Sequence, residues 1–310
     1  MRLELLPFDL EPFRRGGTGV DFVHRLDSGR PGPTVMLNAL THGNELCGAY
    51  ALRWLFERGV RPVRGVLLLS FANVEAYARF DPARPGASRF VTEDLNRIWA
   101  LDKLADPGRS VERRRALELV PFVAEADYLL DLHSMQQTSE PLLLTGLLDK
   151  GLALARAIGR PAHVVADRGH AGGVRMRDYG GFCDPGSGKT SLLIECGQHW
   201  RAASAELAID ASLAFLRACG AVPADFAADR PTPAAPQRVI EVTEAVTVAT
   251  DAFSFVQPWR GLEVIPRAGT PIGRDGDRPI LTPYDDCVLV MPTLRLRPGQ
   301  TAVRLGRFLG

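Results

Sequence analysis

The sequence predicts an α/β domain with a largely parallel or mixed sheet, followed by a smaller all-β domain. Over the first two thirds of the 310 residues, apolar strand-like runs alternate with longer helical stretches. Several runs, such as VLLLSFA and SLLIE, are continuously apolar, which is typical of strands covered on both faces. Beyond Gln237 the chain breaks into short β-rich runs separated by Gly and Pro. We expect the two domains to cover residues 1–228 and 229–310.

The elements of the first domain follow one another as strand and helix. The expected strands are Thr34–Ala39, Arg64–Ala72, Asp127–Leu132, Pro141–Thr145, His163–Ala166 and Ser191–Glu195. The expected helices are Asn44–Arg58, Val111–Ala126, Leu148–Ile158 and Ala203–Ala218. Gly59 and Gly159 stand where glycine commonly caps the C-terminus of a helix.

The segment Ala221–Gln237 differs in composition from its surroundings. Four of its 17 residues are Pro and six are Ala, which favours an extended linker or a surface wrap. The runs RVIEVTEAVTVAT, FSFVQ, GLEVI, CVLVM and TAVRLGRF then follow as short strands. They predict a terminal β domain of about 70 residues.

Composition limits the classes of partner and compartment. Lys and Arg total 37 and Asp and Glu total 36, so no basic field predicts binding to nucleic acid or to an anionic membrane. The five cysteines are dispersed without a CxxC pair, which argues against a disulfide framework. The N-terminal stretch lacks a signal-peptide core, and no apolar run is long enough to span a membrane. We therefore expect a cytoplasmic protein.

The first chemical signal is the stretch NALTHGNELCGAYAL. An apolar strand ends at Ala39, a short turn carries His42, and a helix is expected to begin at or near Glu45. Because His42 and Glu45 are three residues apart at a helix start, both side chains can point at one spot. An imidazole and a carboxylate are two of the three protein ligands in one common type of catalytic zinc site, and the third is another His.

The stretch DYLLDLHSM supplies that second imidazole. His133 directly follows an expected strand, and Asp131 or a nearby carbonyl is placed to orient its ring. Ligands collect beyond the carboxyl ends of strands in α/β sheets, where His42 and His133 both stand. A zinc ion held by two His and one Glu keeps one coordination position for water. We predict metal ligation by His42, Glu45 and His133.

A further carboxylate and two arginines complete the predicted site. Glu195 stands at the end of the expected strand SLLIE, where a carboxylate can take a proton from the attacking water and pass it to a leaving amine. Arg89, Asn96 and Arg97 cluster in the polar stretch SRFVTEDLNRIW. An Arg fork can hold a carboxylate by two hydrogen bonds, and a second Arg can stabilise charge on a carbonyl oxygen.

Other reactive residues are given structural interpretations. His170 and His199 are left as pocket-lining or structural residues, because a catalytic site needs only three protein ligands. Cys196 follows Glu195 on the same strand, so it points to the opposite face and into packing. The run GSGKT lacks the first glycine of a phosphate-binding loop and precedes a strand, so we reject that function.

Taken in order, HGNE (42–45), DLNR (94–97), DLH (131–133) and Glu195 resemble the succinylglutamate desuccinylase/aspartoacylase family. The resemblance covers roughly residues 34–200 by motif, and the family's appended β domain matches the tail. It implies a zinc-carboxypeptidase-like mixed sheet flanked by helices and one zinc ion per chain. It also implies His42, Glu45 and His133 as the zinc ligands.

The resemblance further implies a role for each remaining site residue. Glu195 would be the general base and acid, Asn96 and Arg97 would bind a substrate carboxylate, and Arg89 would polarise the carbonyl. Aspartoacylase-like enzymes carry further Arg and Tyr residues before the catalytic Glu. In that region Arg175, Arg177 and Tyr179 are present here without a clear alignment, so the substrate side chain stays open.

The resemblance implies a zinc-dependent hydrolase that cleaves the amide bond of a small, carboxylate-bearing N-acyl amino acid, with no nucleic-acid or membrane partner. Two alternatives stay open from the sequence. One is a zinc carboxypeptidase acting on a peptide or cell-wall fragment, and the other is a non-catalytic zinc-binding relative. The sequence leaves self-association into a homo-oligomer open.

Overall fold

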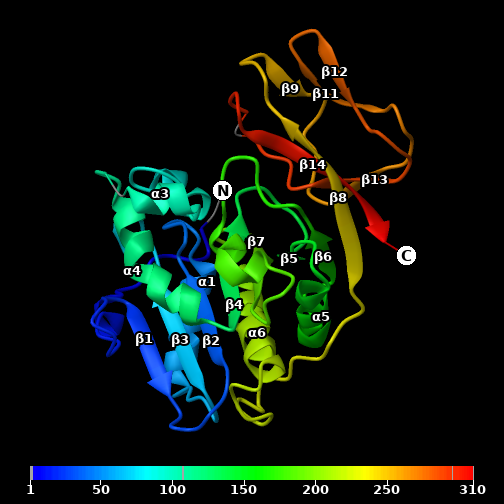
Figure 1. Ribbon diagram of the computed structural model, residues 1–310. Coiled ribbons are helices and arrows are strands. Elements are labelled where there is room, and N and C mark those ends of the chain that lie inside the picture. The colour runs from blue at the N-terminus through cyan, green and yellow to red at the C-terminus, as the bar shows by residue number, and fades with distance from the viewer. Residues whose placement is uncertain (1–2, 107, 295, 310) are drawn as a thin grey trace.

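A large mixed sheet forms the centre of the molecule (Figure 1). The computed structural model describes residues 3–106, 108–294 and 296–309. Within these residues the sheet has eleven strands. In spatial order they are β1 (Val23–Asp27), β3 (Val66–Phe71), β2 (Thr34–Ala39), β4 (Tyr128–Met135), β7 (Thr190–Gln198), β5 (Leu142–Leu144), β6 (His163–Ala166), β8 (Arg238–Thr247), β14 (Thr301–Leu309), β13 (Cys287–Val290) and β10 (Glu263–Ile265).

The strands that carry the site run in one direction. β3, β2, β4 and β7 are mutually parallel, whereas β1 and β5 pair antiparallel with their neighbours β3 and β7. The carboxyl ends of β2, β4 and β7 therefore meet at one edge. The predicted α/β class with a parallel or mixed sheet is confirmed.

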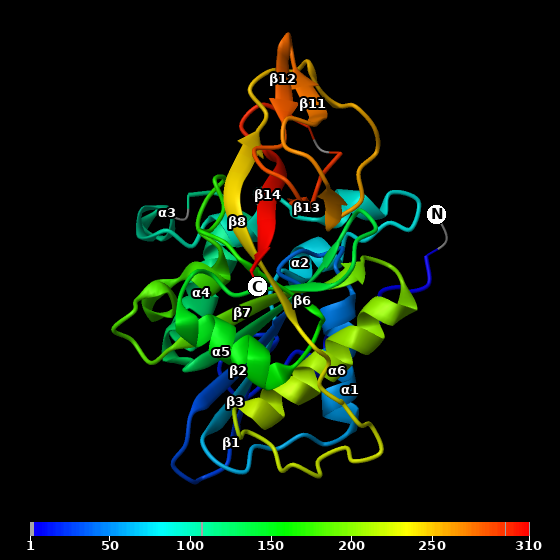
Figure 2. The same ribbon diagram turned by 90° about the vertical axis from the view of Figure 1, so that its right-hand side faces the viewer.

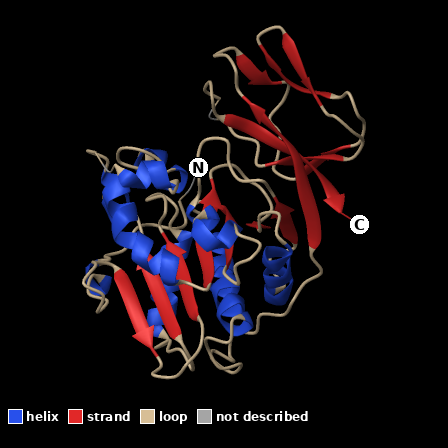
Figure 3. Ribbon diagram, viewed as in Figure 1, coloured by secondary structure: helices blue, strands red, loops and turns tan. Residues whose placement is uncertain are grey.

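Helices cover both faces of the sheet (Figure 3). One face packs against α1 (Cys47–Glu57), α5 (Asp149–Ile158) and α6 (Ala202–Ala218), and the other against α4 (Val111–Glu125) and loops near Trp99 and Phe182. Alternation along β2 explains both cores, because Val35, Leu37 and Ala39 face α1 whereas Met36 faces α4. The shorter helices are α2 (Val74–Tyr77), α3 (Leu101–Ala105), η1 (Glu11–Phe13), η2 (Pro85–Ser88), η3 (Leu95–Arg97), η4 (Met176–Asp178) and η5 (Gly180–Cys183).

The C-terminal β region continues the main sheet (Figure 2). β8 pairs with β6 on one side and with β14 on the other, so the sheet passes from the α/β part into the tail. A separate three-stranded sheet, made of β9 (Phe253–Phe255), β11 (Pro271–Asp275) and β12 (Arg278–Leu281), lies beyond it. The expected C-terminal β-rich region is present, and its division from the first domain at residue 229 stays a prediction.

Some boundaries differ from the expected ones. α1 begins at Cys47, so Glu45 lies in the preceding turn and outside the helix. β4 extends to Met135, so His133 lies inside a strand where the sequence placed it just beyond one. β1, β11 and β12 were not expected, because charged residues and prolines interrupt their apolar character. No helix in the described ranges is long and apolar enough to cross a membrane.

Candidate active site

Strand register brings the central side chains together. His133 on β4 pairs directly with Glu195 on β7, and Asn38 on β2 pairs with Asp131 on β4. Paired residues of neighbouring strands face the same side of a sheet, and residues two apart on one strand do so as well. Asp131, His133 and Glu195 therefore share the face that α4 and the loops cover.

A strained turn places His42 beside Asp131, His133 and Glu195. Leu40, immediately after β2, has a φ of 60°, which is rare for a bulky side chain and is held by complete burial. Gly43 fits because a Cβ there would lie 2.3 Å from the backbone nitrogen of Tyr77 and 2.6 Å from the carbonyl oxygen of Ser88. The turn can therefore pack closely against the segment that carries Arg89. The backbone carbonyl of Arg89 accepts a hydrogen bond from the N–H of Gly43 at 3.1 Å.

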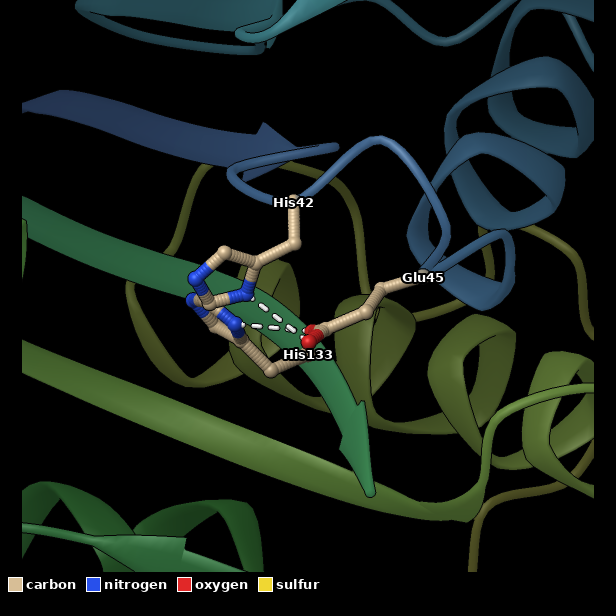
Figure 4. A group of neighbouring side chains, drawn as sticks. All are labelled: His42, Glu45 and His133. Atoms are coloured by element: carbon tan, nitrogen blue, oxygen red, sulfur yellow. Dashed lines mark hydrogen bonds and ion pairs between the residues drawn. The ribbon is translucent and has the colours of Figure 1, made fainter. Parts of the chain in front are cut away.

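His42, Glu45 and His133 form one buried cluster (Figure 4). Nδ1 of His42 lies 2.8 Å from Oε1 of Glu45, and Nδ1 of His133 lies 2.9 Å from Oε2 of Glu45. One nitrogen or oxygen from each of the three residues lies within 4.8 Å of the others. The two imidazoles thus turn the same ring atom toward one carboxylate.

The other ring nitrogen of each imidazole, Nε2, lies against a carboxylate of its own. Nε2 of His42 lies 2.9 Å from Oδ1 of Asp94, and Nε2 of His133 lies 2.7 Å from Oδ2 of Asp131. Oδ1 of Asp131 in turn accepts from Asn38 Nδ2 at 2.7 Å and from Thr41 Oγ1 at 2.8 Å. These contacts fix ring orientation and leave Nδ1 of each ring as the atom facing inward.

The cluster is strongly coupled by charge. Burial raises the pKa of the Glu45 carboxyl, but the adjacent His42 and His133 bring that pKa well below its usual range. Burial lowers the pKa of His133, but Asp131 and Glu45 raise it well above the ordinary histidine value. The ring of His133 therefore lies between two carboxylates that favour a positive charge at its position.

This donor set fits a zinc ion. Two imidazole nitrogens and one carboxylate oxygen are the ligands of a common catalytic zinc type, and carboxylate-held outer nitrogens accompany such ligands. All three donor residues are buried, so a cation there would be shielded from bulk water. The residues predicted from the sequence as metal ligands are thus brought together.

Glu195 lies beside the cluster with little polar support. Its Oε2 is buried and has no hydrogen-bond partner among the described residues. Burial, and then the negative charge of Glu45, raise the pKa of the Glu195 carboxyl well above its usual range, against the opposing effect of His133 and Arg89. A carboxyl with a raised pKa at the edge of a cavity is suited to exchange protons with a ligand.

The two predicted arginines have different surroundings. Arg89 donates to Oε1 of Glu45 at 2.9 Å and to Oδ2 of Asp94 at 3.0 Å, so it is tied to the cluster itself. Arg97 donates to the carbonyl of Asn96 at 2.7 Å. Burial lowers the pKa of Arg97 to about 10; the negative charge of Asp94 opposes this shift, whereas the positive charge of Arg89 adds to it. Arg97 keeps guanidinium donors for a ligand.

Asn96 is held rigidly beside Arg97. It lies in η3, its backbone N–H donates to Oδ1 of Asp94 at 2.9 Å, and its Oδ1 accepts from the N–H of Met176 at 3.0 Å. With its oxygen engaged, the side-chain amide presents Nδ2 as a donor.

These residues open onto one cavity of about 460 Å³. Its lining includes the six residues His42, Glu45, His133, Glu195, Arg89 and Arg97, together with Asn96. The C-terminal β region contributes Gly261, residues 291–293, residues 299–301 and Arg304. Part of the cavity wall is therefore built from a segment of the chain more than 40 residues beyond the last helix of the α/β part, α6.

Arg175 and Arg177, which stood unaligned in the sequence, are engaged in structural ion pairs. Arg175 donates to both oxygens of Asp167 at 2.8 Å and to Asp178 at 2.5 and 3.1 Å. Arg177 donates to Asp178 at 2.6 Å and to two backbone carbonyls. Tyr179 packs edge-on against Trp99, so its ring is part of the hydrophobic packing.

Two further histidines, His170 and His199, and Cys196 lie near the site without joining the cluster. His170 and His199 both line the cavity, and Nδ1 of His199 lies 2.9 Å from Oγ of Ser134. Cys196 is buried in the hydrophobic core on the α1 side of the sheet, as alternation with Glu195 predicted.

Three residues near the site were missed as contributors. Asp94 was noted only as part of a motif, yet it binds both His42 and Arg89. Glu112 on α4 is fully buried and accepts from the N–H groups of residues 91–93, which fixes the loop leading to Asn96. Arg304 gave no signal except a single charge between Val303 and Leu305 in an apolar strand.

A mixed α/β sheet with a buried His/Glu/His cluster at the carboxyl ends of parallel strands defines an α/β protein with a candidate metal centre. The family model described as the succinylglutamate desuccinylase/aspartoacylase catalytic domain matches residues 31–218, more than half of the chain. The chain belongs to the succinylglutamate desuccinylase/aspartoacylase family.

Individual curated relatives align with a shorter part of the chain than the family model does. An N-acyl-aromatic-L-amino acid amidohydrolase (carboxylate-forming) of Rattus norvegicus is 33% identical over 131 residues, 38% of either chain. A probable aspartoacylase of Parasynechococcus marenigrum (strain WH8102) is 31% identical over 136 residues, 40% of this chain and 43% of the relative. The aligned part thus spans about two fifths of the length of these curated relatives.

A solved structure extends the likeness to the whole fold. The succinylglutamate desuccinylase from Vibrio parahaemolyticus superposes with a TM-score of 0.70 and 18% identity, covering 94% of this chain and 87% of that one. This similarity includes the C-terminal β region and confirms the expected family fold.

Proposed function

We propose that this protein is a zinc-dependent hydrolase that cleaves the amide bond of a small, carboxylate-bearing N-acyl amino acid. The observation that carries the proposal is the convergence of His42, Glu45 and His133 beside Glu195 in one cavity. Family membership supports it, since one curated relative is named as an N-acyl amino acid amidohydrolase. We also propose that residues 1–228 form the catalytic domain and 229–310 the linker and β domain.

Nδ1 of His42, a carboxylate oxygen of Glu45 and Nδ1 of His133 would hold the zinc ion. When bound, zinc polarises an amide carbonyl and lowers the pKa of water to roughly 7. Asp94 and Asp131 keep both imidazole rings oriented through their Nε2 atoms.

The chain's own residues supply binding and proton transfer. Arg97 and Asn96 anchor the substrate carboxylate, which fixes the amide against Glu195. Arg89 stabilises the negative charge that develops on the carbonyl oxygen. Glu195 accepts the proton of the attacking water at its unpartnered Oε2 and then delivers it to the nitrogen of the departing amine.

The cavity favours a small substrate over a polymer. Its volume of about 460 Å³ suits a compact metabolite, and residues 291–293 and 299–301 of the C-terminal β region form part of its wall. This wall is the observation that sets the deacylase above a carboxypeptidase acting on a peptide or cell-wall fragment.

The direct test combines metal analysis with a substrate screen. The zinc-loaded chain is assayed for amine release from N-acetyl, N-succinyl and N-formyl amino acids, with short peptides alongside. We expect one zinc per chain and turnover of at least one N-acyl amino acid. Cleavage of peptides alone would make the chain a carboxypeptidase, and bound zinc without any turnover would make it a non-catalytic relative.

A further inference from the structure

A second cavity, of about 570 Å³, lies beside the substrate cavity. It is bounded by the starts of α5 and β7, by η5 and by residues 167–174. Within the part of the chain that the structure describes, none of the proposed metal-binding, catalytic or carboxylate-binding residues lines it. A cavity of this volume is in the range that small-molecule sites occupy, so it has room for a ligand of its own.

The two cavities share one wall, made of residues 167–175. Arg168 and Ala171 line the second cavity, Arg175 lines the substrate cavity, and His170 lines both. A ligand in one cavity is therefore separated from a ligand in the other by a single segment of chain.

The same wall supports the residues proposed to bind the substrate. Gly173 has a φ of 139°, and a Cβ there would lie 2.2 Å from the carbonyl oxygen of Arg97. Just beyond the wall, the N–H of Met176 donates to Oδ1 of Asn96 at 3.0 Å. Three of the residues 167–173 are glycines, which lose much conformational freedom when they are ordered. The placement of Asn96 and Arg97 therefore depends on how well this wall is ordered.

The carboxylates of the second cavity already have cationic partners. Both oxygens of Asp167 accept from Arg175 at 2.8 Å. Asp178 accepts from Arg175 at 2.5 and 3.1 Å and from Arg177 at 2.6 Å. These two acids are thus neutralised within the protein and do not favour a cationic ligand.

Two cations of the second cavity lack such a partner. Nζ of Lys150 donates to three backbone carbonyls at 2.7–3.1 Å, and Arg168 is exposed. Among the described residues no carboxylate oxygen lies within 4.0 Å of the charged group of either. Leu148, Val174 and Phe182 add apolar surface beside these charges. Apolar walls with unpaired positive charge suit an anion that has an apolar body.

We propose that this cavity is a second ligand site for a small organic anion with an apolar body, such as an aromatic carboxylate, and that its occupation strengthens substrate binding by ordering the shared wall. A second ligand pays less to order a wall that a first ligand has already ordered, so the two should bind with positive coupling. The site goes beyond the proposed function, and only its effect on substrate rests on that function.

Cys183 provides a reporter inside the site. It lines the second cavity and is exposed, whereas the other four cysteines are buried. Its thiolate attacks the disulfide of 5,5′-dithiobis(2-nitrobenzoate), which leaves one nitrobenzoate on Cys183 through a mixed disulfide and releases one coloured thiolate. Burial and then the charge of Asp178 raise the pKa of the Cys183 thiol, so all rates are compared at one pH. Folded Cys183→Ser should release no thiolate.

The labelling rate should saturate with the concentration of this anionic reagent, because binding precedes reaction. With uncharged 4,4′-dithiodipyridine the rate should stay linear. Free 4-nitrobenzoate should slow the labelling, and 4-nitrobenzamide should not.

Arg168→Met should raise the half-saturating reagent concentration about 3- to 10-fold. Arg30→Met is the matched control and should not, because Arg30 is also exposed without an ion pair among the described residues but lies outside the cavity. A rate linear in the anionic reagent, or an unchanged half-saturation in Arg168→Met, would overturn the proposal.

The coupling is measured on protein that carries the nitrobenzoate on Cys183, after removal of excess reagent. We expect KM for the N-acyl amino acid to fall about fivefold or more relative to unlabelled and thiopyridine-labelled protein. The kcat should stay within about twofold, because the wall supports the binding residues Asn96 and Arg97. Reduction of the label should restore KM. An unchanged or raised KM contradicts the coupling.

Reciprocity gives a check without turnover. In Glu195→Gln, a saturating N-acyl amino acid should lower the half-saturating reagent concentration by the same factor. Saturable labelling itself needs neither zinc nor hydrolysis. A chain that releases no amine but shows it refutes the deacylase function and keeps the second site, and linear labelling of an active deacylase gives the reverse result. Circular dichroism melts confirm that each variant is folded.

Discussion

The substitution Asp131→Asn tests how the structure prepares His133 to bind a metal. Asp131 is fully buried, accepts from Asn38 and Thr41 through Oδ1, and faces Nε2 of His133 through Oδ2. An asparagine keeps the shape and the Oδ1 acceptor but presents an NH₂ group to Nε2. A neutral imidazole that accepts at Nε2 carries its proton on Nδ1, which is the atom facing Glu45.

The expected loss of zinc affinity follows from these contacts. Binding at Nδ1 would require the ring to change tautomer against the new donor, or the amide to turn its NH₂ toward Asn38. Either arrangement leaves a buried donor unsatisfied, at about 1–3 kcal/mol. Replacement of a residue that orients a metal ligand typically weakens metal binding 10- to 100-fold, about 1.4–2.8 kcal/mol. We expect a loss in this range.

The assay is competition for zinc with a chromophoric chelator at neutral pH, with urea unfolding of the metal-free proteins alongside. Asp275→Asn is the matched control, because Asp275 also accepts several hydrogen bonds but lies in the C-terminal β region, away from the cluster. If folded Asp131→Asn binds zinc as tightly as the wild-type chain, the proposed orientation of His133 is wrong.

Three further predictions concern catalysis. Glu195→Gln should lower turnover by about 10²- to 10⁴-fold while one zinc stays bound, and loss of the zinc from this variant would make Glu195 a ligand. Arg97→Met should weaken kcat/KM about 10- to 100-fold on a carboxylate substrate but far less on its α-amide, and equal losses would refute a carboxylate grip. Burial raises the pKa of Glu195, and the base must be ionised, so kcat/KM should fall as pH falls through that raised pKa. An acidic limb in the ordinary glutamate range would contradict this assignment.

Local sequence patterns were sufficient to predict the central strands and the residues that the cluster contains. The continuous apolar runs of β3, β4 and β7 are covered on both faces, so their composition reflects their place in the sheet. His42 and Glu45 are three residues apart in one turn, so their approach needs only local geometry. These features depend on neighbours in sequence, which is why they could be predicted.

Long-range pairing was not predictable from the same patterns. Glu195 meets His133 because β7 pairs with β4 in one particular register, and a shift of one residue would turn its side chain to the other face. The entry of β8 into the main sheet and the arrival of Arg304 at the cavity depend on strand order across the whole chain. The contact of Asp94 with His42 spans 52 residues, and the contacts of Glu112 with the N–H groups of residues 91–93 span 19 to 21 residues.

The account depends on His42, Glu45 and His133 holding one metal ion, and zinc titration of the metal-free chain tests this most directly. Wild-type protein should bind one equivalent of zinc per chain, and X-ray absorption should report a first shell of nitrogen and oxygen ligands with the outer-shell scattering of two imidazole rings. Folded His133→Ala should lose tight binding of that equivalent. Retention of one tightly bound zinc by this variant would contradict the account.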